Sequence, residues 1–378
     1  MIYVVQPGDT LWSIARQYGV TVAQIAALNQ IPDPDVLVVG QALLILSRIK
    51  QGPLTIDVGG YAYPFISPWV LRETLPFLSQ LAVFSYGFTP EGQLLPPVLA
   101  DGWMVERARA AGVRPALVLT PLGRDGQFSN QLVHALLQNA QAQVRLLQEI
   151  QARMALLGFG ELNIDFEYVL PEDREGFAAF VKLAADTLEE LVSVCLAPKS
   201  SRDQRGLLYE GKDYRLLGQA ADRVLLMTYE WGYKYGPPMA VAPLEPVRRV
   251  VEYALTEIPA EKISLGLANY GYDWPLPFEQ GVTVARTIGN VEAVEIAKRE
   301  KTNIIFDWES KSPWFQYTDG RGVRHVVWFE DVRSWKYKLD LLREYGLTGV
   351  GIWQLMQLFR AGMNLIGDEF RSQPTEVS

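Results

Sequence analysis

From Leu54 onward, short apolar runs alternate with longer segments of helical periodicity, and this repeat constrains the fold more than any other feature of the chain. Helical spacing of apolar residues is clearest over 130–157 and 174–191. Eight strands separated by helices predict an α/β protein with a (β/α)8 barrel, and a doubly wound open sheet is the alternative. No Gly-x-Gly-x-x-Gly follows the first strand, so a dinucleotide site has no support. The runs expected as strands are Leu54–Val58, Leu81–Tyr86, Arg114–Thr120, Leu162–Tyr168, Ser193–Pro198, Arg223–Tyr229, Lys262–Ala268 and Gly349–Trp353.

The stretch between the seventh and eighth strands, residues 275–335, is too long for a single crossover helix. We expect it to form a small α+β insertion beside the mouth of the barrel. Its expected elements are a helix over 290–298, strands over 302–308, 314–318 and 323–329, and a hairpin turn at 318–322. Its aromatic side chains are either its own core, which we favour, or a platform for a sugar: Trp308, Trp314, Phe315, Tyr317 and Trp328.

The fourth expected strand carries the main catalytic candidates. In Leu162–Tyr168, apolar residues alternate with Asn163, Asp165 and Glu167. Residues two apart on a strand share a face, so these three polar groups line one side. Burying carboxylates without partners is costly, which indicates that this side faces a wet cavity. The pattern predicts a catalytic acid held beside a second carboxylate.

Residues 1–47 form a separate pattern of strand, helix, helix and strand. Asp9 or Thr10 is placed to cap the first helix, Gly19 ends it, and Thr21 caps the second. The polar stretch that follows, with Gly and Pro, suits a linker. We therefore divide the chain into a module at 1–47, a linker at 48–53, the barrel at 54–371 and a tail at 372–378.

Composition excludes several classes of protein. The net charge is −8 with no basic run, which argues against a nucleic-acid partner. No apolar run is long enough to span a membrane, and the first residues lack the pattern of a signal peptide. The single cysteine, Cys195, lies in an apolar run and is expected in the core. His134 and His325, the only histidines, are far apart, and we expect no metal site and no cofactor.

The N-terminal segment resembles a LysM module through Val5–Ala15, Leu28–Asn29 and the stretch from Pro34 to Gln41. The resemblance implies binding of glycans that contain N-acetylglucosamine, such as peptidoglycan or chitin. The implied groove lies between the loop after the first strand and the loop before the second. The residues expected to contact the glycan there are Gly8, Asp9, Thr10, Leu11 and Ile31. The alternative is a small capping subdomain packed on the barrel.

The barrel resembles glycoside hydrolase family 18, the chitinase-like barrels. Met227–Tyr229 matches the strand-six motif of this family, with Glu230 where Asp is usual, and Gly351–Trp353 matches the segment whose tryptophan lies under the sugar. The strand-four motif of the family is Asp-x-x-Asp-x-Asp-x-Glu. Its last two acidic positions match this chain and its first two do not, since the four positions fall on Gly160, Asn163, Asp165 and Glu167.

The resemblance implies retaining, substrate-assisted hydrolysis, an exception to the scheme with two catalytic carboxylates. Glu167 is the implied general acid and base, and Asp165 orients the 2-acetamido group of the substrate. Tyr229 is expected to hydrogen-bond the acetamide carbonyl, and Trp353 to stack under the sugar. Apolar neighbours and Asp165 are both expected to raise the pKa of Glu167. Further substrate contacts are expected at the ends of the strands, from Asn163, Glu230, Asn269, Tyr86 and Tyr272.

With a LysM at its N-terminus, the chain is most similar to the spore-germination branch of the family, which includes cortical-fragment-lytic N-acetylglucosaminidases. We therefore expect a monomeric hydrolase that cleaves β-1,4 N-acetylglucosamine linkages in peptidoglycan, in the bacterial spore or the cell wall. A chitinase is one alternative. The other is a catalytically silent, wall-binding lectin, against which the retained Asp165, Glu167 and Tyr229 argue.

Overall fold

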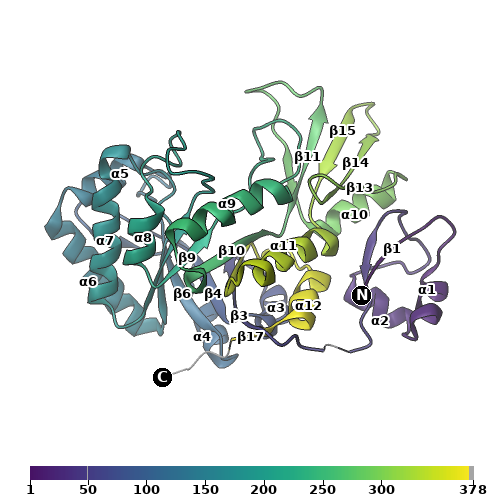
Figure 1. Ribbon diagram of the computed structural model, residues 1–378, viewed down its shortest axis with the longest axis horizontal. Helices are drawn as coiled ribbons and strands as arrows, with labels where there is room; N and C mark the ends of the chain where they lie inside the picture. Colours follow the sequence, from purple (N-terminus) through teal and green to yellow (C-terminus); the bar gives the residue numbers. More distant parts are fainter. Residues whose placement is uncertain (49, 374–378) are drawn as a thin grey trace.

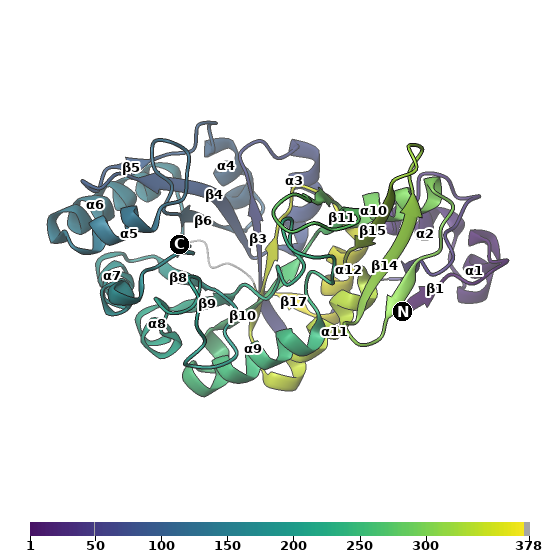
Figure 2. The ribbon, with the colours of Figure 1, turned by 90° about the horizontal axis from the view of Figure 1, so that it is seen from above.

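The computed structural model describes residues 1–48 and 50–373. One residue of the expected linker, 49, and most of the expected tail, 374–378, lie outside the described residues. Figure 1 shows a barrel with a small sheet above one end and an N-terminal module beside that sheet, and Figure 2 shows the same order of parts from above.

The barrel predicted from the strand–helix repeat is present. Within the described residues, eight parallel strands pair in the order β3-β4-β6-β7-β8-β9-β10-β16, and β16 pairs with β3 to close the sheet. The strands are β3 (Thr55–Ala62), β4 (Gln80–Phe88), β6 (Arg114–Leu119), β7 (Glu161–Ile164), β8 (Leu191–Leu196), β9 (Arg223–Leu226), β10 (Ile263–Ala268) and β16 (Gly349–Trp353). Two short strands extend the sheet, β5 (Leu94–Leu95) on β4 and β17 (Arg371–Ser372) on β3.

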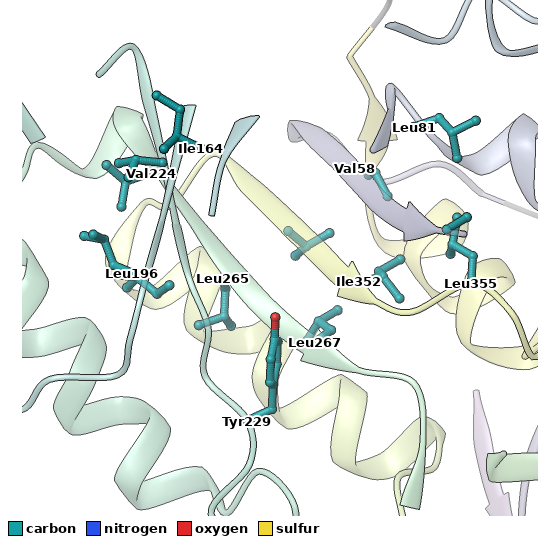
Figure 3. Packing of buried hydrophobic residues seen from close by; sticks show 14 of the residues in the cluster. Val58, Leu81, Ile164, Leu196, Val224, Tyr229, Leu265, Leu267, Ile352 and Leu355 are labelled. Atoms are coloured by element: carbon teal, nitrogen blue, oxygen red, sulfur yellow. The ribbon is translucent and has the colours of Figure 1, made fainter. Parts of the chain in front are cut away.

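Alternate residues of these strands pack in two directions. One set packs outward against the helices and forms the main core, and Figure 3 shows part of it, including Val58, Leu81, Ile164 and Val224. The other set fills the interior of the barrel. The surrounding helices are α3 (Pro68–Thr74), α4 (Gly102–Ala110), α5 (Asn130–Leu137), α6 (Ala140–Leu157), α7 (Arg174–Thr187), α8 (Tyr214–Ala220), α9 (Leu244–Glu257), α11 (Val332–Tyr345) and α12 (Arg360–Glu369). Short 3-10 turns are η1 (Leu75–Phe77), η2 (Pro171–Asp173) and η3 (Ala260–Lys262).

The segment expected as one helix over 130–157 is two helices, α5 and α6. Asn139 separates them, because its side chain accepts a hydrogen bond from the backbone N–H of Ala142 at 3.1 Å and so caps α6. The helix ends at Gly158, whose φ of 85° is left-handed. The two helices therefore divide at a residue type that favours helix starts over helix interiors.

The insertion is a five-stranded sheet in the order β12-β11-β15-β14-β13 with one helix. It begins at Gly271, before the expected start at 275, because β11 continues directly from the loop after β10. Its elements are β11 (Gly271–Leu276), β12 (Arg286–Ile288), α10 (Asn290–Arg299), β13 (Ile305–Asp307), β14 (Ser312–Thr318) and β15 (Arg324–Trp328). Of its aromatics, Phe315 is fully buried in the core of the insertion, Trp314 and Trp328 stack on each other, and Trp308 is 67% exposed.

The N-terminal module has the expected order of β1 (Ile2–Val4), α1 (Leu11–Tyr18), α2 (Val22–Leu28) and β2 (Ala42–Leu44). Thr10 and Thr21 cap the two helices, each accepting a hydrogen bond from the third residue of its helix. Gly19 ends α1 with a left-handed φ of 66°. The module has a small hydrophobic core of its own.

The module is packed against the insertion. Val38 lies in the hydrophobic cluster of the insertion, and the carbonyl of Val39 accepts a hydrogen bond from the backbone N–H of Ile304 at 2.9 Å. Arg333 donates to the carbonyl of Gly40 at 3.0 Å. Gly40 has a φ of 87°, and a Cβ there would lie 1.8 Å from the oxygen of Ile304, so only glycine fits this contact.

A second contact joins the module to α12. Arg360 donates from its backbone N–H to Gln30 at 2.6 Å and from its side chain to the carbonyl of Ala27 at 3.0 Å. The same guanidinium also pairs with Glu73 of α3 at 2.8 Å. Both figures show the module beside α10 and α12. The module is thus docked on the barrel through two separate sets of contacts.

Among the described residues, no helix has both the length and the apolar character needed to cross a membrane.

Candidate active site

The two carboxyl groups predicted as catalytic lie just beyond the end of β7. Asn163 is the third residue of this strand, and the backbone N–H of Asp165 still bonds to the carbonyl of Leu119 on β6 at 2.8 Å. Ile164 and Phe166 are fully buried in the outer core, so Asp165 between them points to the barrel interior. Asp165 is 5% exposed, and Glu167 is half-buried. The predicted alternation of faces is therefore present.

The electrostatics of this pair suit acid–base chemistry. Burial, and after it the charge of Glu167, raise the pKa of Asp165 to about 7. Burial also raises the pKa of Glu167, while the positive charge of Lys212 acts against both shifts. Since two neighbouring buried carboxyls disfavour the doubly charged state, one proton is held by the pair near neutrality.

Asn163 links the pair to a polar layer deeper in the barrel. Its amide oxygen accepts from the hydroxyl of Tyr61 at 3.2 Å and from the thiol of Cys195 at 3.4 Å, and its amide N–H donates to Ser193 at 2.8 Å. Cys195 is buried, as expected, but it faces the barrel interior. Ser193 in turn donates to Glu161 at 2.5 Å. Asn163 therefore hydrogen-bonds to three protein partners, and Asp165 has no carboxylate behind it at this position.

Trp353 lies in a cluster of aromatic rings at the end of β16. Its ring centroid is 4.9 Å from that of Phe84, 5.8 Å from that of Tyr61 and 6.1 Å from that of Tyr63. Apolar ring faces of this kind are suited to stacking against a sugar. The sequence reasoning overlooked Tyr61, Tyr63 and Phe84. Tyr61 and Tyr63 could have been found, because they are two residues apart at the end of the first strand and so share its inner face.

Tyr229 and Glu230 follow β9. Tyr229 is 9% exposed, its ring touches the backbone position of Gly266, and Figure 3 shows it near the leucines of β10. Glu230 has a left-handed φ of 69° and accepts hydrogen bonds from Tyr272 at 2.9 Å and from Tyr270. Burial raises the pKa of Glu230, and the two tyrosine hydroxyls oppose this shift. Tyr272 and Tyr270 thus both lie beside the site through Glu230.

Asn269 hydrogen-bonds to the loop that follows Trp353. Its amide group donates at 2.9 Å to the carbonyls of Gln354 and Gln357, and its oxygen accepts from Asn290 at 3.3 Å. These bonds fix the loop that follows Trp353. Because both N–H groups of Asn269 are occupied, the structure places it as a support for that loop, and this differs from the expected substrate contact.

The prediction for Tyr86 is wrong. Tyr86 is fully buried outside the barrel interior, where its hydroxyl donates to Asp101 and accepts from Arg153 at 3.0 Å. The pairing of β4 with β6 shifts register between Val83 and Tyr86. Such an irregularity changes which residues face inward, so Phe84 points to the site and Tyr86 points to the helices.

The expected glycan-contacting residues of the module differ in their exposure. Gly8 and Thr10 are exposed, and Asp9 is half-buried because it accepts hydrogen bonds from the hydroxyl of Tyr3 and the backbone N–H of Gln6. Leu11 is 1% exposed in the core of the module, so its side chain is not available to a ligand. Ile31 lines a small cavity between the module and α10.

Lys212 was not predicted either. It lies in the loop before α8, is 1% exposed, and its charge acts on both of the carboxyls predicted as catalytic. A lysine among polar and glycine residues normally indicates an exposed loop, so the sequence carries no signal for this position.

Comparisons with known proteins agree with this architecture. The sequence model of Glycosyl hydrolases family 18 matches residues 122–357, and that of the LysM domain matches residues 3–45. The chain is 39% identical to the cortical fragment-lytic enzyme of Bacillus subtilis, over 98% of each chain. It is similar to the crystal structure of the Bacillus cereus spore cortex-lytic enzyme SleL, with a TM-score of 0.82 and 34% identity, over 99% of this chain and 87% of the other. The chain therefore belongs to glycosyl hydrolase family 18, carries a LysM domain at its N-terminus, and is a glycosidase related to the cortical fragment-lytic enzymes.

Proposed function

We propose that this protein is a peptidoglycan-lytic N-acetylglucosaminidase that acts on spore cortex or its fragments. The observation that carries the proposal is the carboxyl pair at the mouth of the barrel, the buried Asp165 and the half-buried Glu167, next to the aromatic cluster around Trp353. The similarity to cortical fragment-lytic enzymes along nearly the whole chain supports the choice of cortex as substrate. The LysM domain supports attachment to a glycan of the cell wall.

In the proposed reaction, Glu167 protonates the glycosidic oxygen as the bond to the anomeric carbon breaks. The carbonyl oxygen of the substrate's own 2-acetamido group attacks the anomeric carbon and forms an oxazolinium. Glu167 then removes a proton from water, which opens this intermediate with net retention of configuration. The raised pKa of Glu167 supports its role as an acid near neutrality.

The other residues of the mouth have roles in holding the sugar. Asp165 accepts the acetamide N–H and balances the positive charge that develops on the ring. Tyr229 donates to the acetamide carbonyl, which aligns the attacking oxygen, and Trp353 stacks under the sugar. Glu230, held by two tyrosines, forms a polar wall of the same mouth.

In this proposal the enzyme is a monomer located in the spore or at the cell wall. In the LysM loop, Gly8 and Thr10 are exposed and can contact the glycan, with Leu11 contributing only through its backbone.

The test is mass spectrometry of the products released from purified spore cortex, vegetative peptidoglycan and chitin oligomers, with the Glu167→Gln variant as control. We expect new N-acetylglucosamine reducing ends from cortex. The variant should lose turnover by roughly 10²- to 10⁴-fold, the usual contribution of a general acid, and keep glycan binding. Products from chitin oligomers alone would replace cortex with chitin as substrate. Undiminished hydrolysis by Glu167→Gln would overturn the assignment of the acid.

A further inference from the structure

Lys212 is a buried cation without a hydrogen-bonding partner. Its Nζ is inaccessible to solvent and makes no hydrogen bond to any residue that the structure describes. Its backbone is fixed, since the N–H donates to the carbonyl of Tyr209 at 3.2 Å and the carbonyl accepts from Nζ of Lys199 at 3.0 Å. The ammonium is therefore held at a defined position in the interior.

The charges that balance this ammonium are those of the catalytic carboxyls. Burial lowers the pKa of Lys212, and the charges of Asp165 and then Glu167 oppose that shift. The Oδ1 atom of Asp165 is likewise buried and without a hydrogen bond among the described residues. No direct ion pair joins Lys212 to either carboxyl within the part of the chain that the structure describes. Gly211, the residue before Lys212, packs against the carbonyl of Val169, two residues after Glu167, so the ammonium acts on the carboxyls through its charge alone.

A purely structural lysine would look different. Lys338 is fully buried as well, but its Nζ lies 2.7 Å from Glu330, so its charge is neutralised by a direct partner. A buried ammonium without such a pair destabilises the fold, because it loses its hydration and gains no hydrogen bond. Lys212 thus costs stability at its position and contributes its charge to the mouth of the barrel. A residue that costs stability at an active site is a candidate for a functional role.

Asn163, the residue behind Asp165, explains why a positive charge from Lys212 is needed at this site. Asn163 stands where the family motif has an aspartate, and its side chain hydrogen-bonds to three protein partners. Asp165 therefore has no second carboxylate behind it at this position. Without a positive charge nearby, the two carboxyls would tend to be neutral together, because burial disfavours the ionised form of each. A nearby positive charge favours the state in which one of them is ionised and the other protonated.

We propose that Lys212 is a positioning residue for the reaction proposed above: its ammonium is the buried counter-charge of the Asp165–Glu167 pair and keeps Asp165 ionised as an acceptor for the substrate acetamide while Glu167 holds the proton. The role rests on the proposed function, because it assigns the two protonation states by the roles of the two carboxyls. Lys212 acts through Asp165 and does not touch the reacting atoms.

Several other groups act on the same site and have to be considered in any titration. They lie on β3 and β8, in the loops that follow β3, β7 and β9, and in the loop before α8. They are Tyr61 and Tyr63 from β3 and its end, Asp165, Glu167 and Tyr168 after β7, Cys195 of β8, Tyr229 and Glu230 after β9, and Lys212 itself. Of these, Lys212 is the one with a positive charge.

The experiment compares pH profiles of kcat/KM on soluble cortex fragments for the wild type, Lys212→Met and Lys212→Arg. Loss of the positive charge should shift both limbs of the Lys212→Met profile to higher pH, by about one pH unit or more. Lys212→Arg keeps the charge and should restore the wild-type limbs. Lys212→Met should fold, because methionine fills a similar volume and removes an unpaired buried charge. Superimposable limbs for the wild type and Lys212→Met would overturn the proposal.

Lys338→Met is the control matched for burial. It should lower thermal stability and leave the limbs of the profile unchanged, since Lys338 pairs with Glu330 outside the site. Stability measured against pH gives a readout that does not need turnover. In Lys212→Met, the pH range over which the fold loses stability should extend to higher pH than in the wild type. If the enzyme hydrolyses cortex but Lys212→Met shifts neither the kcat/KM profile nor the pH dependence of stability, the role of Lys212 is wrong and the proposed function stands. If no glycan is hydrolysed but Lys212→Met still shifts the pH dependence of stability, the proposed function is wrong and the charge interaction stands.

Discussion

Asp165 and Glu167 lie two residues apart in the chain, on the same face. Burial, and after it the charge of Glu167, raise the pKa of Asp165 to about 7. We expect kcat/KM to follow a bell-shaped pH profile, because the enzyme is active while the pair holds one proton. Activity should fall above about pH 7 as the last proton leaves, and at acidic pH as the second one binds. Steady-state kinetics across this range test the expectation, which a profile rising through neutrality would contradict.

The same titration should appear in the stability of the fold. The folded carboxyl pair keeps one proton between the ordinary pKa of Asp165, 3.8, and about 7, whereas the unfolded chain releases it. Stability from this group is therefore complete below the ordinary pKa and is lost as pH rises toward about 7. In Asp165→Asn, we expect the loss of stability over this window to be smaller, by an amount on the order of a few kcal/mol. Urea denaturation at several pH values measures it, and identical pH dependence in both proteins would refute it.

Tyr229→Phe removes a hydroxyl that we assign to the acetamide carbonyl of the substrate. Loss of one such preorganised donor typically reduces kcat by roughly 10²-fold or more. KM should change much less, because the missing bond aligns the attacking oxygen in the transition state. Measuring kcat and KM separately distinguishes this result from a general loss of binding, in which KM would rise and kcat would stay.

Tyr86→Phe is the matched comparison. The hydroxyl of Tyr86 lies outside the barrel interior, between Asp101 and Arg153. Removing it leaves the buried carboxylate of Asp101 with one hydrogen-bond donor fewer. We expect a loss of about 1–3 kcal/mol in the free energy of unfolding, with kcat/KM unchanged. A fall in kcat/KM without a fall in stability would instead support the original prediction that Tyr86 contacts the substrate.

Lys338→Met should be strongly destabilising. Lys338 and Glu330 are both fully buried and paired at 2.7 Å, so removing the lysine leaves an uncompensated buried carboxylate. Breaking such a pair from one side costs about 3–5 kcal/mol. Replacing Glu330 by Gln in the same protein should recover part of the loss. Equal free energies of unfolding for the single and double variants would show that the pair is not coupled.

The barrel could be predicted because hydrophobic periodicity reports which segments are strands and helices and which faces are buried. All eight barrel strands overlap the expected runs. The faces of the fourth strand were predictable for the same reason, since Asn163, Asp165 and Glu167 alternate with apolar residues. The prediction that Tyr86 faces the substrate was wrong because the register shift in β4 reverses the alternation of inward and outward residues. The residue types in that run do not indicate this shift.

Other features depend on contacts that lie far apart in the sequence. Lys212 reaches the carboxyls only after the loop before α8 folds against the residues that follow β7, where Gly211 lies against the carbonyl of Val169. Asn269 is polar at a strand end, as a substrate contact would be, but its three partners come from later segments. Side-chain partners of this kind are set by tertiary packing, which the local pattern does not encode.

The docking of the N-terminal module has a consequence for reach. A flexible tether lets a binding domain sample many positions, and its length sets how far the attached enzyme can travel. Here Val38 is part of the hydrophobic cluster of the insertion, and Arg360 joins the module to α12. The distance between the module and the barrel mouth is therefore set by this interface and not by the residues that connect them. The spacing between the glycan-binding module and the barrel mouth is therefore fixed. Lengthening the linker between them would change this spacing only if the interface came apart.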